Sequence, residues 1–242
     1  MIIDDLIQRS PVRIFERSIG GGLTSGEIGV IAAPSGIGKT SVLVQIALDK
    51  LLQGKKVIHI SYTKHNDYVL AWYEDIFDEF IRKKNLDNPE EVKNEAVKNR
   101  VLLKFSQEGV TGEQIRRSLR ALIVEGGFNA EAIIVDGFDF SGSGGAQNGE
   151  RLSRVKELAA ELGLAVWYSC NIPGDSPRDK RGIPGILQDA LDAIDVVILL
   201  ETQGDHIGLK VAKDRARFNP EQMALKLDPK SLLIQEAAGG KG

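Results

Sequence analysis

The stretch that most constrains this chain is VIAAPSGIGKTS, residues 30–41. It runs from apolar residues through a Pro-Ser-Gly turn into Gly-Lys-Thr, and Ala33 stands where the usual phosphate-loop pattern has its first glycine. Residues 28–33 read as a buried strand, and residues 41–52 read as a helix because apolar residues recur at helical spacing. A strand, a glycine-rich turn and a helix in this order predict a cradle for phosphate groups.

The residue types of this turn suit a polyphosphate. A turn at the start of a helix presents backbone N–H groups and the positive end of the helix dipole to an anion. Glycines let the chain approach phosphate oxygens, the lysine ammonium reaches the β- and γ-phosphates, and the threonine hydroxyl binds Mg²⁺. We therefore expect ATP with Mg²⁺ as the ligand; GTP stays open, because adenine selectivity leaves little trace in a sequence. The expected contact residues are Ser35, Gly36, Ile37, Gly38, Lys39, Thr40 and Ser41.

A second motif supplies an acid. Residues 132–135 read as an apolar strand that ends at Asp136, within AIIVDGFD. An acid at the carboxyl end of a buried central strand lies beside the phosphate loop, where open α/β sheets bind their ligands. We expect Thr40 and Asp136 to hold the metal. The alternative for Asp136 is a turn aspartate, since Asp-Gly commonly marks turns.

The chain as a whole predicts an α/β fold. Short apolar runs alternate with helical stretches, which indicates a mainly parallel sheet flanked by helices; later runs, joined by turns, indicate antiparallel strands at the C-terminal end. No Gly-, Pro- or Ser-rich linker divides the chain, so we expect one domain over residues 1–242, with a core at about 18–235 and a flexible tail at 237–242. The expected strands after the first are 57–61, 101–105, 132–135, 165–169, 196–200, 207–213, 224–227 and 231–234.

Composition narrows the classes of function. Thirty-one basic and 34 acidic residues give a formal charge of −3, so overall charge does not attract nucleic acid. One cysteine, Cys170, excludes an internal disulfide and a Cys-rich zinc site, and it reads as a small buried apolar residue. No run of 18 apolar residues and no basic signal start occurs, so we expect a cytoplasmic protein without a membrane partner.

These motifs together resemble those of the RecA-like ATPases. GGLTSGEIGVIAAPSGIGKTSVLVQIA, residues 21–47, looks like the phosphate-loop region of the RadA and KaiC branches, and the similarity continues through IIVDG and AVWYSCN. LKVAKDRARF, residues 209–218, is similar to the Lys-x-Arg strand of KaiC and of the replicative helicase DnaB. The resemblance covers about residues 18–235. It implies a RecA-like P-loop fold that binds Mg-ATP between subunits of a homo-oligomeric ring or filament.

The resemblance also assigns roles to the C-terminal cations. On a strand, alternation would project Lys213, Arg215 and Arg217 to one face. Such a row either protects an edge strand or reaches a neighbouring subunit's γ-phosphate as an arginine finger, and the resemblance favours the finger. The finger requires a head-to-tail assembly. The candidate catalytic residues are Lys39, Asp136, Lys213 and Arg215.

Two positions depart from the family's pattern. Thr63 stands where RecA-like ATPases place the glutamate that orients the attacking water, and neither Thr63 nor the following lysine is a base at neutral pH. His65, Asp67 and Asp139 are substitutes near in sequence, and without one hydrolysis should be slow, since a positioned base contributes about 10²- to 10⁴-fold. Asn171 replaces the glutamine that senses the γ-phosphate, and it could still donate a hydrogen bond.

Three functions remain open, and the first is preferred. It is a KaiC-like regulatory ATPase that passes its nucleotide state to a protein partner. The second is a DnaB- or RadA-like helicase or recombinase motor. In this family residues 139–150 and 174–189 face the pore or filament axis; the first loop has no Lys or Arg and the second balances its cations with acids, so nucleic acid is not favoured. The third is a scaffold that holds ATP without hydrolysing it.

Overall fold

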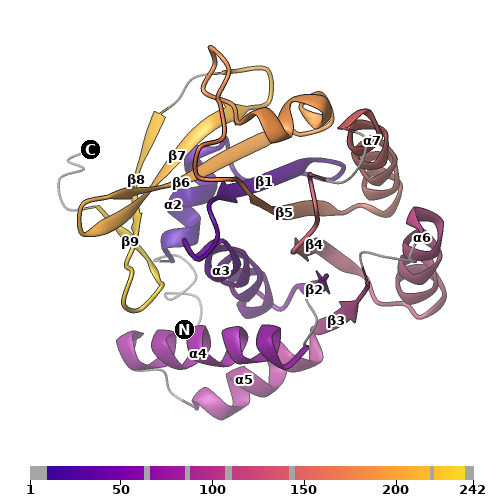
Figure 1. The fold of residues 1–242 in the computed structure, drawn as a ribbon. Helices are drawn as coiled ribbons and strands as arrows, with labels where there is room; N and C mark the ends of the chain where they lie inside the picture. The colour runs from indigo at the N-terminus through magenta and orange to yellow at the C-terminus, as the bar shows by residue number, and fades with distance from the viewer. Residues whose placement is uncertain are drawn as a thin grey trace.

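The computed structural model describes residues 10–62, 66–84, 88–106, 111–141, 145–218 and 221–237. Within these ranges the strands form one nine-stranded sheet in the order β3-β2-β4-β5-β1-β6-β7-β8-β9 (Figure 1). The pairs from β3 to β6 are parallel, and those from β6 to β9 are antiparallel, which confirms the predicted α/β architecture. The strands are β1 Ile28–Ala33, β2 Lys56–Ser61, β3 Arg100–Lys104, β4 Ala130–Asp136, β5 Ala165–Asn171, β6 Val196–Gln203, β7 His206–Asp214, β8 Glu221–Leu227 and β9 Ile234–Glu236.

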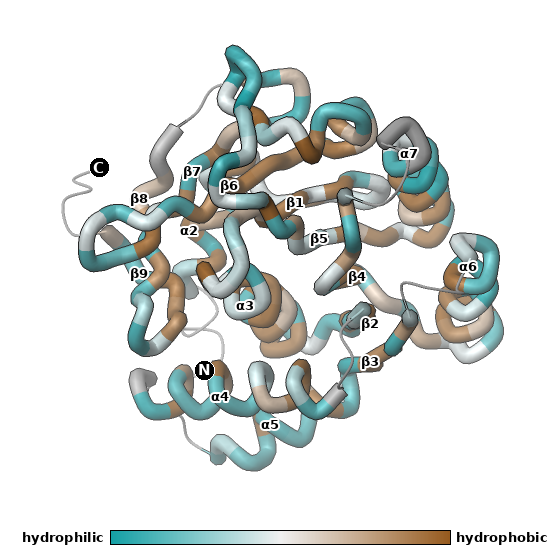
Figure 2. The backbone as a smooth tube through the Cα atoms, viewed as in Figure 1, coloured by the Kyte–Doolittle hydropathy of each residue, from teal (hydrophilic) through white to brown (hydrophobic). Residues whose placement is uncertain are grey.

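Helices cover both faces of the sheet. Along β1, Ile31 and Ala33 belong to the core shared with α2 to α5, whereas Val30 and Ala32 belong to the core shared with α6 and α7. Burial on both faces explains why β1 is apolar throughout instead of alternating with polar residues. Figure 2 shows apolar residues along the strands and α3, with hydrophilic residues on the outer helices. The helices are α2 Pro11–Ser18, α3 Lys39–Leu52, α4 Asn66–Lys84, α5 Pro89–Lys98, α6 Gly112–Arg120 and α7 Gly145–Leu162, with short helices at Ala121–Glu125 and Gly185–Ala190.

One glycine inside β1 has a packing role. Gly29 pairs with Trp167 of β5, and a Cβ added at Gly29 would lie 2.4 Å from the six-membered ring of that indole. A side chain at this position would push the indole away, so the glycine allows Trp167 to lie across β1. The Trp167 ring also contacts Phe15 of α2, with 5.5 Å between the ring centroids.

The N-terminal helix α2 extends the ordered fold beyond the predicted start of the core. The Ser10 hydroxyl accepts a hydrogen bond from the Val12 N–H, and Pro11 occupies the first helical position. Phe15 and Ile19 are fully buried under the sheet. The Ser-Pro pair was the available sequence signal, because serine caps helices and proline favours their first turn.

Two further regions differ from the expected boundaries. The last strand begins at Ile234, three residues later than expected, because the Asp228 carboxylate accepts the N–H groups of Lys230 and Ser231 and so forms a turn. Between β2 and β3 the charged helices α4 and α5 follow one another, and Tyr73, Ile76 and Phe77 of α4 are buried in the core. Of the expected tail at 237–242, residues 238–242 lie outside the described residues. Among the described helices, none is both long and apolar enough to cross a membrane.

Candidate functional site

The loop of residues 34–38 joins β1 to α3 at the carboxyl edge of the parallel strands (Figure 1). Gly36 and Gly38 have φ angles of 81° and 98°, in the left-handed region that favours glycine. Gly38 caps α3, and among the described residues no side chain accepts a hydrogen bond from the first N–H groups of the helix. The start of α3 therefore presents free donors and a positive dipole end to this edge.

The two glycines of the loop have different surroundings. A Cβ added at Gly36 would meet no atom within 4 Å, whereas one added at Gly38 would lie 2.4 Å from Cδ2 of Leu227. Gly36 thus faces open space that a ligand could fill. Gly38 instead packs against the end of β8, so a side chain at position 38 would have to displace the buried side chain of Leu227.

Lys39 extends over the loop. Its Nζ donates hydrogen bonds to the carbonyl oxygens of Ala33 at 3.0 Å and Pro34 at 2.8 Å, and to Oδ1 of Asn171 at 3.4 Å. Burial lowers the pKa of Lys39, and the nearby charge of Asp136 opposes this change. The structure therefore places the half-buried ammonium of Lys39 beside Asn171, the predicted γ-phosphate sensor.

Thr40 and Asp136 meet across the edge of the sheet. The Thr40 hydroxyl donates a hydrogen bond of 2.9 Å to Oδ2 of Asp136, and the Ser169 hydroxyl donates one of 2.6 Å to Oδ1. The Gly137 N–H donates to the Ser169 oxygen at 2.9 Å. Asp136 is only 4% exposed, so this chain of hydrogen bonds fixes the orientation of a nearly buried carboxylate. Sequence reasoning missed Ser169; a lone serine in the apolar run of β5 was the signal.

The donor set fits a magnesium ion. A threonine hydroxyl and a carboxylate are hard oxygen ligands, and Mg²⁺ binds few protein groups, completing its shell with phosphate oxygens and water. In the part of the chain that the structure describes, no group of three or more His, Cys, Asp or Glu residues could hold a metal ion without such help. Thr40 and Asp136 would therefore bind the metal only together with a phosphate ligand.

Ser41 points away from the loop. Its side chain is fully buried, and its hydroxyl donates a hydrogen bond to the carbonyl oxygen of Leu232. Gln45, one turn later, donates to the same carbonyl at 2.9 Å and accepts the Ile234 N–H at 2.7 Å. Leu232 has a φ of 54°, in the left-handed region. These contacts fasten the β8–β9 turn to the first turns of α3, and only the backbone of Ser41 remains for its predicted contact with nucleotide.

The C-terminal cations do not form the expected row. The strand β7 ends at Asp214, and Arg215 follows it in a turn with a φ of 53°, so the alternation argument was wrong for Arg215. Lys213 is only 7% exposed, and its ammonium donates to the carbonyl oxygens of Leu191, at 2.6 Å, and Ile194. Burial lowers the pKa of Lys213. It holds the segment before β6 in place within this chain.

Arg215 is bound from several sides. Its guanidinium contacts both carboxylate oxygens of Glu27, at 2.8 and 2.7 Å, and donates to the carbonyl oxygens of Ile19 and Gly22. The hydrogen bonds with the Glu27 carboxylate, and next the one with the Asp214 carboxylate, raise the pKa of Arg215. Arg217, whose side chain is 80% exposed, is the accessible cation of the three. A role of Arg215 as a finger between subunits stays a prediction, and it would require breaking this network.

We expect Arg215→Ala to lower the free energy of unfolding by about 2 kcal/mol, because it leaves a shielded carboxylate and two carbonyls without their donor. Arg217→Ala is the matched control and should change it by less than about 0.5 kcal/mol. Urea unfolding measures both. If Arg215→Ala unfolds like the unaltered protein, and its ATP turnover is low but recovers on mixing with a Lys39 variant, the finger role is supported instead.

The structure describes only some of the residues that could activate the attacking water in place of the missing glutamate. Thr63, Lys64 and His65 lie outside the described residues. Asp67 lies in the first turn of α4 and is exposed. Asp139 is exposed, and its carboxylate accepts the Ser141 N–H at 2.7 Å and the Ser141 hydroxyl at 2.6 Å. Asp139 is thus turned toward its own loop, which does not favour it as the substitute base.

The second of the two loops discussed for DNA is internally paired. Asp179 accepts the N–H groups of Arg181 and Ile183, both at 2.9 Å, and pairs with the Arg181 guanidinium. Arg178 pairs with Glu201 of β6 at 2.5 Å. Two of the three cations therefore have acidic partners, and Lys180 is exposed. The first loop is described only in part, because residues 142–144 lie outside the described ranges.

Comparison with known proteins gives a short match. Over 46 residues, 19% of this chain, the sequence is 44% identical to the DNA repair protein RadA of Aquifex aeolicus (strain VF5). The match covers a tenth of that protein's length. No protein-family model matches the chain. The likeness to RadA gives limited support to a relationship with RecA-like ATPases.

Proposed function

We propose that this protein is a RecA-like nucleotide-binding protein that holds Mg-ATP at the loop of residues 34–38. The observation that carries the proposal is the 2.9 Å hydrogen bond between Thr40 and Asp136. These residues lie 96 positions apart, in the phosphate-loop pattern and at the end of a buried strand. A hydroxyl and a carboxylate joined beside a helix start are the two protein ligands that a phosphate-bound Mg²⁺ needs.

Different groups of the site contact different parts of the bound nucleotide. The free N–H groups at the start of α3 and the open space at Gly36 receive the phosphates. Lys39 exchanges its backbone carbonyl acceptors for phosphate oxygens, a stronger pairing because the acceptor is charged. Asn171 lies within reach of the same ammonium, where a γ-phosphate would extend. When bound, Mg²⁺ would neutralise phosphate charge next to Asp136.

We further propose a KaiC-like regulatory role with slow hydrolysis, in a homo-oligomer that signals its nucleotide state to a protein partner. The sequence has Thr63 where the family places its catalytic glutamate, and the Asp139 carboxylate is engaged by Ser141. An ATP site without a positioned base keeps its ligand for longer, which suits signalling better than movement along DNA. If the hydrolysis rate falls to zero, the protein is a scaffold that holds ATP without hydrolysing it.

The likeness to a DNA repair protein favours one second candidate, a DNA-dependent motor. The paired charges in residues 174–189 do not support it, because arginines bound to acids offer little to phosphates. Single-stranded DNA that binds with a strong salt dependence and accelerates ATP turnover would favour the motor. ATP-dependent assembly without DNA binding would favour the regulatory role.

Calorimetry tests the nucleotide site directly. We expect Mg-ATP to bind with micromolar affinity, and Asp136→Asn to weaken it at least tenfold, because the variant loses the metal's carboxylate ligand. The matched control Asp78→Asn changes an exposed acid of α4 and should bind as the unaltered protein does. If folded protein takes up no nucleotide with magnesium present, or if both variants bind equally, the proposal fails.

A further inference from the structure

A largely apolar cavity lies among α2, α3, α4 and β9. It has a volume of about 330 Å³, and the first residues of α2 form part of its wall. The nucleotide site proposed above uses none of the residues that line it. The apolar part of the wall includes Leu48, Leu52, Ile76, Phe77, Phe80 and Leu233.

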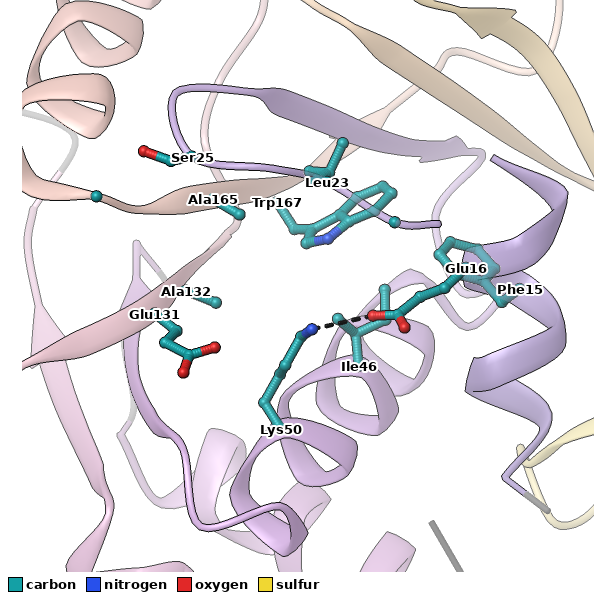
Figure 3. A pocket seen from close by; sticks show the side chains of 12 residues that line it. Phe15, Glu16, Leu23, Ser25, Ile46, Lys50, Glu131, Ala132, Ala165 and Trp167 are labelled. Carbon is teal, nitrogen blue, oxygen red and sulfur yellow. Dashed lines mark ion pairs between the residues drawn. The ribbon is translucent and has the colours of Figure 1, made fainter. Parts of the chain in front are cut away.

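The helix α2 is anchored beside this cavity. Figure 3 shows Phe15 of α2 next to Trp167 of β5, and Glu16 of α2 paired with Lys50 of α3. The Glu16 carboxylate lies 3.0 Å from the Lys50 ammonium. These contacts hold α2 against α3 and the sheet, so they also fix the place at which the chain enters α2.

The chain enters α2 at the wall of the cavity, because Ser10 and Pro11 both line it. Ser10 has an extended backbone, with φ −65° and ψ 131°, as a following proline favours. A helix that precedes Ser10 therefore cannot continue straight into α2. The preceding segment, residues 1–9, lies outside the described residues, and it joins the fold at this wall.

The sequence of this segment, MIIDDLIQR, is amphipathic with a helical period. Its apolar residues after the first occupy positions 2, 3, 6 and 7, and its polar residues occupy positions 4, 5, 8 and 9. At 3.6 residues per turn the two sets fall on opposite faces of a helix, whereas a strand would mix them on both faces. A helix this short is marginal in water by itself, so it needs an apolar surface to pack against.

We propose that residues 2–9 form a short helix whose apolar face packs into the cavity of the same chain. The volume is close to the roughly 300 Å³ at which sites for drug-sized ligands begin, so the cavity admits a few aliphatic side chains. The charged residues of the wall are the acids Asp49, which is paired with Arg13, and Glu236, which is exposed. They repel Asp4 and Asp5, so the polar face of the helix is turned to water. The covalent link at Ser10 gives the segment a higher effective concentration at its own cavity than at that of a second copy.

Methyl NMR of the full chain without nucleotide tests the docking independently of the proposed ATP site. Ile3→Ser combined with Leu6→Ser should shift the methyl signals of Leu48, Ile76 and Leu233, because the apolar face no longer fills the cavity. The matched control, Asp4→Ser combined with Asp5→Ser, changes two residues of the polar face and should leave these signals in place.

A peptide makes the test reversible. Added to the protein with Ile3→Ser and Leu6→Ser, the peptide MIIDDLIQR should return the three signals saturably to their original positions. A peptide that carries the same two serines should bind at least about tenfold more weakly, because two buried aliphatic side chains are lost. The signal of Val124, in the short helix after α6, should stay in place throughout.

A spin label distinguishes docking within one chain from exchange between two copies. Cys170 is buried, so a nitroxide reagent should modify only the cysteine introduced by Gln8→Cys. The label should broaden the Ile76 and Leu233 signals of its own chain. These signals should stay sharp when spin-labelled chains without isotope are refolded together with isotope-labelled chains without nitroxide. Broadening in this mixture would mean that a second copy fills the cavity, and it would overturn the proposal. Equal methyl shifts in the two double variants, or a peptide that does not bind, would overturn it as well.

Discussion

Replacing Lys39 with alanine is expected to weaken the binding of Mg-ATP at least 100-fold. The Lys39 ammonium is half buried above the loop, so its attraction to a phosphate would be only partly screened by water. Loss of charge-assisted contacts to two phosphate groups is worth about 3 kcal/mol, which is roughly a factor of 100 or more in affinity. Calorimetry measures the affinity, and phosphate release measures turnover.

The same variant should not destabilise the protein without nucleotide. Burial lowers the pKa of Lys39, which means that the folded state disfavours the charged ammonium. At neutral pH the charge of Lys39 therefore lowers the free energy of unfolding of the protein without nucleotide. Removing the ammonium should leave the free energy of unfolding equal or slightly raised. Lys98→Ala, at an exposed lysine of α5, is the control and should change neither quantity. Equal ATP binding and phosphate release by Lys39→Ala and the unaltered protein would remove the ATPase proposal.

The second large effect is expected at Gly38. Gly38→Ala should lower the free energy of unfolding by about 3 kcal/mol and abolish nucleotide binding. Two costs add here: a left-handed φ of 98°, and a Cβ only 2.4 Å from Leu227. The chain cannot relieve the contact by moving the loop, because Ser41 and Gln45 fix the same helix to Leu232. Denaturant unfolding measures the loss.

Gly36→Ala is the matched control, since its φ of 81° is also left-handed but its surroundings are open. It should cost only the backbone strain, about 1 kcal/mol. A double variant with Leu227→Ala should recover part of the Gly38→Ala loss, because the clash is relieved while the strain remains. Equal destabilisation by the two alanine variants would mean that the contact with Leu227 contributes nothing.

The parts of the site that are local in sequence could be predicted. The strand, the glycines and the start of α3 follow from a continuous pattern of 12 residues, and Asp136 follows from the end of an apolar run. Ser169 and Gln45 could not be found in this way, because their partners Asp136 and Leu232 are 33 and 187 residues distant. The misplacement of Arg215 has a related cause: Glu27, its partner, is 188 residues away.

The succession of strands and helices along the chain, the phosphate-loop pattern and its acid could be predicted from the residues alone, because these depend on side-chain periodicity and turn chemistry within short segments. Which polar groups are free to bind a ligand, in contrast, depends on contacts between distant segments of the folded chain. Lys213, Arg215 and Ser41 have the residue types of a catalytic site, yet their donors are bound to carbonyls and carboxylates from distant segments. A buried donor must have a hydrogen-bond acceptor, and for these three residues the acceptor comes from a segment that is near only in the folded chain. Their roles could therefore not be assigned from residue type alone.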